Sequence, residues 1–139
     1  MINFIVCEDN NIILQKNIDI INKTMFKNNN SYRIYPFTKH NNALNDVIRE
    51  DLGNKIYILD IELENSTGID IARQIRKNDV DSIIIISTTY VEYLPYTLKN
   101  KLMLFDFVSK FDSYEENLYK VIVRAIDQLT SEEISSHIN

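Results

Sequence analysis

The chain has 139 residues, of which 45% are hydrophobic and 25% charged, and its formal net charge is -5. These totals are typical of one globular domain, and the acidic balance argues against nucleic-acid binding by this segment, because phosphate contacts need clustered lysine and arginine. No apolar run approaches the roughly 20 residues of a membrane helix, and the N-terminus lacks the basic start of a signal peptide. The single cysteine, Cys7, excludes an internal disulfide and suits a reducing cytoplasm.

The first half of the chain begins with an apolar run at residues 2–7, which predicts a strand. A helical stripe follows, with apolar residues at i, i+4, i+7 and i+11: Leu14, Ile18, Ile21 and Met25. A second strand is predicted at 32–37 and a shorter helix around 44–48. Gly53 then suits a helix stop.

In the second half, the runs at 56–59 and 83–86 are nearly continuous Ile, Leu and Tyr, as in strands that are covered on both faces. The basic residues of 73–77 between them indicate the exposed side of a helix. A fifth strand is predicted at 102–108. The clearest helical stripe follows, formed by Leu118, Val121, Ile122, Ala125 and Leu129.

Tyr90, Tyr93 and Tyr96 stand at i, i+3 and i+6, the spacing of one helical face. Pro95 interrupts this pattern, because proline fits only the first turn of a helix, so we expect the fourth helix to begin near Leu94. Partial burial of the tyrosines and an exposed contact face both remain open.

Strand and helix alternate five times, and right-handed crossovers turn that alternation into an α/β fold, an open parallel sheet with helices on both faces. We expect one domain over residues 1–130. Residues 131–139 lose the apolar stripe and are expected to be frayed or to start a connection to a further segment.

Polar residues stand at the carboxyl ends of four predicted strands, which is the edge where open α/β sheets bind ligands. They are Glu8 and Asp9 after the first strand, Asp60 after the third, Ser87 after the fourth and Lys110 after the fifth. Two carboxylates about 4 Å apart repel by about 4 kcal/mol at an effective dielectric constant near 20. Lys110 offers one positive charge, so the acids predict a divalent cation, and an all-oxygen ligand set favours Mg²⁺ (or Mn²⁺).

A metal ion and a lysine beside a carboxylate are suited to phosphoryl transfer, in which the carboxylate attacks phosphorus and forms an aspartyl phosphate. Asp60 is the predicted nucleophile, because it ends a buried strand, and such a strand holds the carboxylate rigidly in place. Capping of a helix or turn is the alternative role for Glu8, Asp9 and Asp60. Thr88 or Thr89 takes the place of Ser87 if the fourth strand ends later.

These residues resemble the receiver domains of two-component response regulators over residues 1–130. The resemblance rests on Glu8 and Asp9, the acceptor Asp60, Gly68 eight residues later, and the two residues Ser87 and Lys110, all in the family's order. It implies a flavodoxin-like (βα)5 fold with strand order 2-1-3-4-5, phosphorylation by a sensor histidine kinase, and no enzymatic activity beyond the domain's own phosphorylation and dephosphorylation.

The resemblance also implies that the backbone carbonyl of Glu62 binds the metal, and that Ser87 and Phe107 form the switch. A phosphorylation-dependent homodimer is expected through the fourth helix, fifth strand and fifth helix. The segments VCEDN, YILDIEL and FDFVSK are most similar to AgrA-type regulators, which bind DNA through a LytTR output domain. The 139 residues do not include such a domain, so we expect either an excised receiver or a stand-alone receiver that acts as a protein-interaction module.

The sequence departs from the receiver pattern at three positions. Phe111 follows the lysine where many receivers have a proline, and Glu64 replaces a proline four residues after the acceptor. Thr88 is larger than the small residue that usually follows the switch hydroxyl, which leaves open a receiver that binds partners without phosphate.

Two other classes fit less well. A hydrolase of the haloacid-dehalogenase type carries a D-x-D pair after its first strand, whereas the candidate nucleophile here follows the third. A nucleotide-binding module needs a glycine-rich turn after the first strand, and CEDNN contains no glycine.

Overall fold

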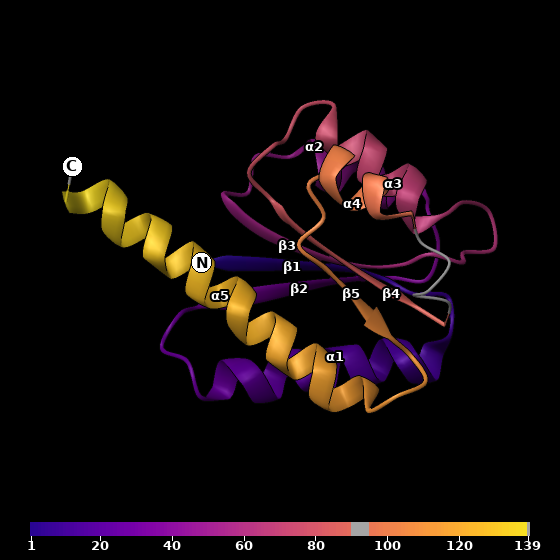
Figure 1. Cartoon of the computed structure of the whole chain (residues 1–139), viewed down its shortest axis with the longest axis horizontal. Helices are drawn as coiled ribbons and strands as arrows, with labels where there is room; N and C mark the ends of the chain where they lie inside the picture. Colours follow the sequence, from indigo (N-terminus) through magenta and orange to yellow (C-terminus); the bar gives the residue numbers. More distant parts are fainter. Residues whose placement is uncertain (90–94, 139) are drawn as a thin grey trace.

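A computed structural model describes residues 1–89 and 95–138 of the chain, with the backbone alone at 96 and 133–138. Five parallel strands alternate with five helices in this part, and the sheet order is β2-β1-β3-β4-β5 (Figure 1). The elements are β1 (Ile2–Cys7), α1 (Asn11–Phe26), β2 (Tyr32–Phe37), α2 (Asn42–Arg49), β3 (Asn54–Asp60), α3 (Gly68–Arg76), β4 (Ile83–Thr88), α4 (Tyr96–Lys101), β5 (Asp106–Ser109) and α5 (Tyr114–Ile138). The predicted fold class and strand order are confirmed.

Two apolar cores lie on the two faces of the sheet. Helices α1 and α5 cover one face, and α2, α3 and α4 cover the other (Figure 1). Along β1, Phe4 and Val6 pack toward α1 and α5, whereas Ile5 and Cys7 pack toward the opposite layer. Because both faces are covered, the central strands carry nearly continuous apolar runs instead of alternating apolar and polar residues.

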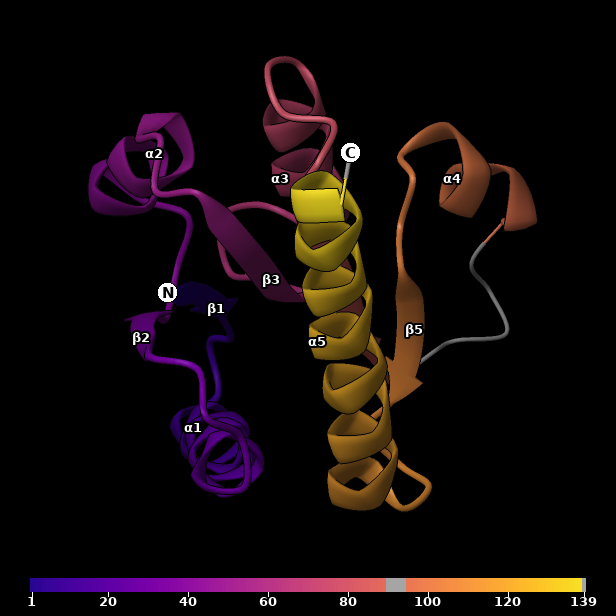
Figure 2. The ribbon, with the colours of Figure 1, turned by 90° about the vertical axis from the view of Figure 1, so that its left-hand side faces the viewer.

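The edges of the sheet differ in their surroundings. Figure 2 shows β5 at one side of the sheet next to α4, and β2 at the opposite side. β2 is more exposed than the central strands, and its register with β1 runs from Ile2 opposite Tyr32 to Cys7 opposite Phe37. β1, β3 and β4 are buried along nearly their whole length.

Three strands differ from the sequence prediction. β3 is longer at both ends, and β4 extends to Thr88. β5 begins at Asp106, not at Leu102, so the predicted start was wrong. The N–H of Leu102 still bonds to the carbonyl of Leu98, and Met103 has a φ of 51°, which turns the chain out of the helix. Residues 102–105 are therefore apolar because a loop packs Leu102 and Leu104 into the core, not because they form a strand.

The helices also refine the prediction. α4 begins at Tyr96, directly after Pro95, which occupies the N-cap position. Tyr90, Tyr93, Leu94 and the side chain of Tyr96 lie outside the described residues. α5 continues to Ile138, so the segment expected to be frayed or to start a connection is helical up to that residue. Over the described residues, none of the helices combines the length and the apolarity that crossing a membrane requires.

Candidate functional site

Three acidic side chains meet at the carboxyl ends of β1 and β3. The two strands pair in a register that places Cys7 opposite Leu59, so the residues that follow them, Glu8 and Asp60, share one edge of the sheet. One carboxylate oxygen each from Glu8, Asp9 and Asp60 lies within 4.8 Å of the others. The structure thus brings together the three acids that the sequence placed at this edge.

The carboxylate of Glu8 is fully buried, and this determines its protonation. Burial raises the pKa of Glu8 to about 7, and the charge of Asp60 adds to the rise. Hydrogen bonds from Lys110 and from the backbone N–H of Asn10, which lies 3.1 Å from Oε2, act in the opposite direction. Even with these contacts the pKa stays near 7, so Glu8 needs a further positive charge to be fully ionised at neutral pH.

Lys110, which follows the end of β5, contacts both buried acids. Its Nζ lies 2.5 Å from Oε1 of Glu8 and 3.1 Å from Oδ2 of Asp60. All three side chains are nearly inaccessible to solvent, with exposed fractions of 10% for Lys110, 1% for Glu8 and 5% for Asp60. A single ammonium thus faces two buried carboxylates, and the carboxylate of Asp9 remains at the exposed side of the cluster.

The loop after β3 holds the side chain of Asp60 and the backbone that follows it. The N–H of Glu62 bonds to Oδ1 of Asp60 at 3.2 Å, and the N–H of Gly68 bonds to the carbonyl of Ile61 at 3.1 Å. A Cβ at position 68 would lie 2.4 Å from the carbonyl oxygen of Asp60. Only glycine allows α3, whose N-cap is Thr67, to begin this close to the strand end.

Glu62 lies beside the cavity, and its side chain is exposed to solvent. Its backbone carbonyl as a metal ligand remains a prediction.

The hydroxyl residues at the end of β4 differ in position. Ser87 pairs directly with Asp60 across the sheet and is fully buried, and its Oγ has no hydrogen-bond partner among the described residues. Thr88 is also buried, and its backbone carbonyl accepts from the N–H of Lys110 at 2.9 Å. Thr89 lines the acidic cavity instead. Although the strand ends later than predicted, Ser87 remains the hydroxyl that is in register with the acid.

Phe107 lies at the edge strand β5, opposite Ile86 of β4. Its ring is partly buried against the core on the α2, α3 and α4 side, and Nζ of Lys99 lies 6.0 Å from the ring centroid. The ring is thus held between the core and a residue of α4. Its role as a switch remains a prediction.

A cavity of about 300 Å³ opens over the acids. It is lined by Glu8, Asp9, Asn10, Ile13, Asp60, Glu62, Leu63, Glu64, Thr89 and Lys110. Two buried carboxylates that share one ammonium, beside a third carboxylate, leave negative charge uncompensated, and carboxylate oxygens are the ligands that a hard divalent cation prefers. The residues therefore fit Mg²⁺.

Sequence reasoning missed three polar residues at or behind the site. Asn10 caps α1 through its side chain, which accepts from two backbone N–H groups, and it also holds Glu8. Asn17 and Tyr114 form a buried hydrogen bond of 2.6 Å behind the cavity. Asn17 offered a signal, because it is a polar residue on the apolar face of the first helix.

Cys7 is a buried packing residue. Burial, together with the neighbouring acids, raises the pKa of its thiol to about 12. The thiol is therefore protonated at neutral pH, and a redox role is disfavoured.

Addition of Mg²⁺ is expected to raise the melting temperature of the protein by relieving repulsion among the three acids. At ten times its dissociation constant, a cation stabilises the fold by about 1.4 kcal/mol, which corresponds to roughly 5 °C. Thermal unfolding with and without Mg²⁺ tests this. Asp9→Ala removes the exposed ligand and should abolish the rise, so an equal rise in the variant, or none in the native protein, would show that the site is misread.

The sheet order, the two helical layers and an acidic cavity with a lysine at the carboxyl edge together have the arrangement of a receiver domain. The structural neighbours of this chain are response regulator receiver domains. No family profile and no curated protein matches the sequence.

A response regulator receiver domain protein from Clostridium thermocellum has a TM-score of 0.75 at 19% identity, and the match covers 94% of this chain and 98% of that one. The response regulator TrrA from Thermotoga maritima, solved in complex with Mg²⁺-BeF, has a TM-score of 0.63 at 25% identity, over 87% and 99% of the two chains. DrrB, an OmpR/PhoB homologue from the same organism, has a TM-score of 0.69 at 19% identity over 92% of this chain. The match covers 54% of DrrB, so the chain spans about half of that protein.

Proposed function

We propose that this chain is a phosphoacceptor receiver domain of a two-component response regulator, and that Asp60 takes a phosphoryl group from a sensor histidine kinase. One observation carries the proposal. Asp60 stands at the carboxyl end of β3, in a cavity that also contains two further carboxylates and the ammonium of Lys110. This combination of nucleophile and charges suits phosphoryl transfer and no other reaction class considered above.

In the proposed step, a carboxylate oxygen of Asp60 attacks the phosphorus of phosphohistidine. The P–O bond forms as the P–N bond breaks, and the electron pair stays on the imidazole, which takes a proton from solvent. Lys110 offsets the charge that gathers on the phosphoryl oxygens. A Mg²⁺ held by Glu8, Asp9, Asp60 and the carbonyl of Glu62 would neutralise the rest of the charge.

The orphaned hydroxyl of Ser87 supports the same assignment. A buried hydroxyl without a partner is costly, and such a group in a native fold needs an explanation. Ser87 lies in register with Asp60, so a phosphoryl group on Asp60 would offer its hydroxyl an acceptor. In this proposal, the domain catalyses only its own phosphorylation and dephosphorylation.

The alternative is a receiver that binds partners without phosphate. The large residue Thr88 favoured this alternative, because a small residue there usually admits the phosphate. Thr88 is buried, and the residues that line the cavity include Thr89 but not Thr88. This arrangement favours phosphorylation over the alternative.

We further propose a cytoplasmic, AgrA-type regulator of transcription, with DNA bound only through a LytTR output domain outside this chain. The support is the similarity of the three sequence segments named above and the net charge of -5, which disfavours direct DNA binding by this domain.

Incubation with acetyl phosphate is the test of the acceptor. With Mg²⁺ present, the protein should gain one phosphoryl group, seen by intact-mass spectrometry, as the P–O bond to acetate breaks. Asp60→Asn should reduce the labelling to background, and so should removal of Mg²⁺. Labelling that survives the substitution unchanged would contradict the assignment.

Phosphorylation is also expected to promote pairing of receivers through the face formed by α4, β5 and α5. On this face, Asp106 binds Arg124 of α5 and lies 3.9 Å from Lys99 of α4. To move a conformational equilibrium from 1:99 to 99:1 takes about 5.5 kcal/mol, more than one hydroxyl contact supplies, so Ser87 and Lys110 must act together.

Sedimentation with and without beryllofluoride, a phosphoryl mimic, measures this pairing. Ser87→Ala should weaken the pairing while Asp60 is still labelled. Ser82→Ala is the matched control. Ser82 directly precedes β4, at the end of the strand away from Ser87, and its hydroxyl bonds to Asp79. An activated protein that remains monomeric at high concentration would show that the switch acts on another partner.

A further inference from the structure

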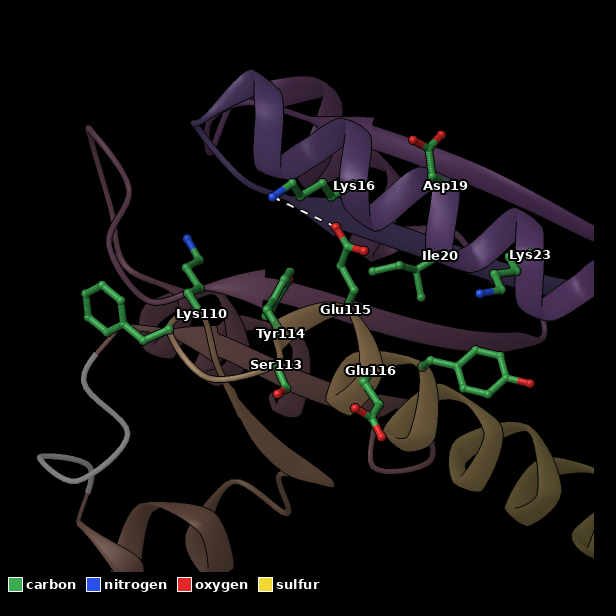
Figure 3. Close-up of a pocket in the computed structure, with 11 residues that line it drawn as sticks. Lys16, Asp19, Ile20, Lys23, Lys110, Ser113, Tyr114, Glu115 and Glu116 are labelled. Carbon is green, nitrogen blue, oxygen red and sulfur yellow. Dashed lines mark ion pairs between the residues drawn. The ribbon is translucent and has the colours of Figure 1, made fainter.

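Two parts of the chain that border the acidic cavity differ in what supports them. Lys110 also lines a groove of about 740 Å³ between α1 and α5, where Lys16 and Glu115 form an ion pair of 3.9 Å (Figure 3). Two long helices therefore support this part. Residues 62–64 line the cavity as well, but they belong to the loop between β3 and α3. Their position depends on the contacts that hold this loop.

The loop closes on itself as a small hairpin, residues 61–68. Glu62 and Thr67 pair as an antiparallel bridge, and the N–H of Gly68 bonds to the carbonyl of Ile61 at 3.1 Å. These contacts fix the base of the 61–68 hairpin close to Asp60. They do not reach its tip, residues 63–66, which lies between the two paired segments.

The tip of the 61–68 hairpin is held by His40, which belongs to the loop between β2 and α2. The Nδ2 of Asn65 donates to the carbonyl of His40 at 2.9 Å, and the N–H of His40 donates to Oδ1 of Asn65 at 3.4 Å. The imidazole Nδ1 of His40 lies 3.0 Å from Oγ of Ser66. The backbone and the side chain of one residue thus hold two consecutive residues of the tip.

The other ring nitrogen of His40 anchors it to two helices. Its Nε2 lies 2.8 Å from Oδ1 of Asn45 in α2 and 3.0 Å from Oε1 of Gln74 in α3. Both neighbours are carbonyl oxygens, which only accept hydrogen bonds, so Nε2 carries a proton. In the neutral ring, Nδ1 then accepts from the hydroxyl of Ser66. These bonds fix the orientation of the partly buried ring and connect the hairpin to α2 and α3.

We propose that His40 is a positioning residue of the metal site, which braces the 61–68 hairpin and thereby the backbone carbonyl of Glu62. The carbonyl lies between two fixed points, the base of the hairpin and the tip that His40 holds. Groups that orient a metal ligand from outside the site contribute to metal affinity. This inference rests on the proposed phosphoacceptor function, in which the carbonyl of Glu62 binds Mg²⁺.

The test is the Mg²⁺ affinity of the native protein, His40→Ala, Ser66→Ala and the double variant, measured by NMR titration of the backbone amides. Each single variant should bind Mg²⁺ roughly fivefold more weakly, which corresponds to about 1 kcal/mol. The double variant should lose little more than either single variant, because the imidazole acts through Ser66. His40→Asn should recover most of the affinity, since its amide oxygen can take the place of Nδ1 as an acceptor.

Two controls separate positioning from a general loss of stability. Thr38→Ala changes an exposed side chain in the same loop as His40, and Tyr32→Phe removes a hydrogen bond of 2.6 Å to Asn22. Both variants should bind Mg²⁺ as tightly as the native protein does. In the metal-free state, the N–H of Gly68 should exchange with solvent roughly fivefold faster in His40→Ala than in either control, because the hairpin opens more often.

Three results would overturn the inference and leave the assignment of the acceptor intact. They are native-like affinity in His40→Ala, losses that simply add in the double variant, and an equal weakening in Tyr32→Phe. If the native protein does not bind Mg²⁺ at all, the proposed metal site fails and the inference fails with it.

Discussion

Gly68→Ala should lower the melting temperature by roughly 10 °C and weaken beryllofluoride binding at the same time. The added Cβ would lie 2.4 Å from the carbonyl oxygen of Asp60 and 3.0 Å from its carbonyl carbon. These are backbone atoms, so either α3 or the end of β3 must move, and forced overpacking of this kind costs about 1–3 kcal/mol. The displaced group is the acceptor itself, which is why stability and binding should fall together.

Gly53→Ala separates these two effects. Gly53 has a φ of 84°, and a Cβ there would meet nothing within 4 Å. Alanine at this position should lower the stability only by the roughly 1–2 kcal/mol that a left-handed backbone conformation costs a residue with a Cβ. Thermal unfolding and beryllofluoride titration of both variants give the comparison. If Gly68→Ala binds the mimic as tightly as Gly53→Ala does, the close approach is not what positions Asp60.

Lys110→Met should destabilise the protein by about 3 kcal/mol without Mg²⁺, because loss of one partner leaves buried carboxylates unpaired. The two carboxylates that Lys110 contacts, those of Glu8 and Asp60, are 1% and 5% exposed, so solvent compensates little. Mg²⁺ should recover much of this loss, since it supplies the missing positive charge. Denaturant unfolding with and without the cation measures both the loss of stability and its recovery.

Lys99→Met is the matched control for Lys110→Met. The ammonium of Lys99 lies 3.9 Å from Asp106, and the two side chains are 32% and 27% exposed, so its loss should cost well under 1 kcal/mol. Mg²⁺ should not change that small cost. A similar loss of stability in both lysine variants would contradict the account of the buried cluster.

The sequence predicted those parts of the fold where local pattern and burial coincide. The strands predicted at residues 2–7 and 32–37 match the observed bounds. In both places an apolar run lies between polar turns, and its spacing does not also fit a helix. The start of β5 was predicted wrongly at Leu102, since a loop that packs leucines into the core produces the same apolar run as a strand. Periodicity cannot distinguish these two causes of burial.

The acidic cluster was predictable because parallel strands bring their carboxyl ends to one edge, whatever the distance along the chain. The contact between Asn17 and Tyr114 was not, since the residues are 97 positions apart and neither follows a strand. Their meeting depends on how α1 and α5 pack side by side, which the apolar stripes specify only as buried faces. The sharp approach of Gly68 to Asp60 likewise depends on the path of the loop between them.

The most direct test of the central claim is the chemical identification of the phosphorylated residue. The protein is treated with acetyl phosphate and Mg²⁺, then with borohydride, which reduces an aspartyl phosphate to homoserine, and its peptides are sequenced by mass spectrometry. We expect homoserine at position 60 and at no other aspartate, and none when Mg²⁺ is left out. Homoserine at another position, or a phosphorylated protein without homoserine at position 60, would contradict the assignment of Asp60 as the acceptor.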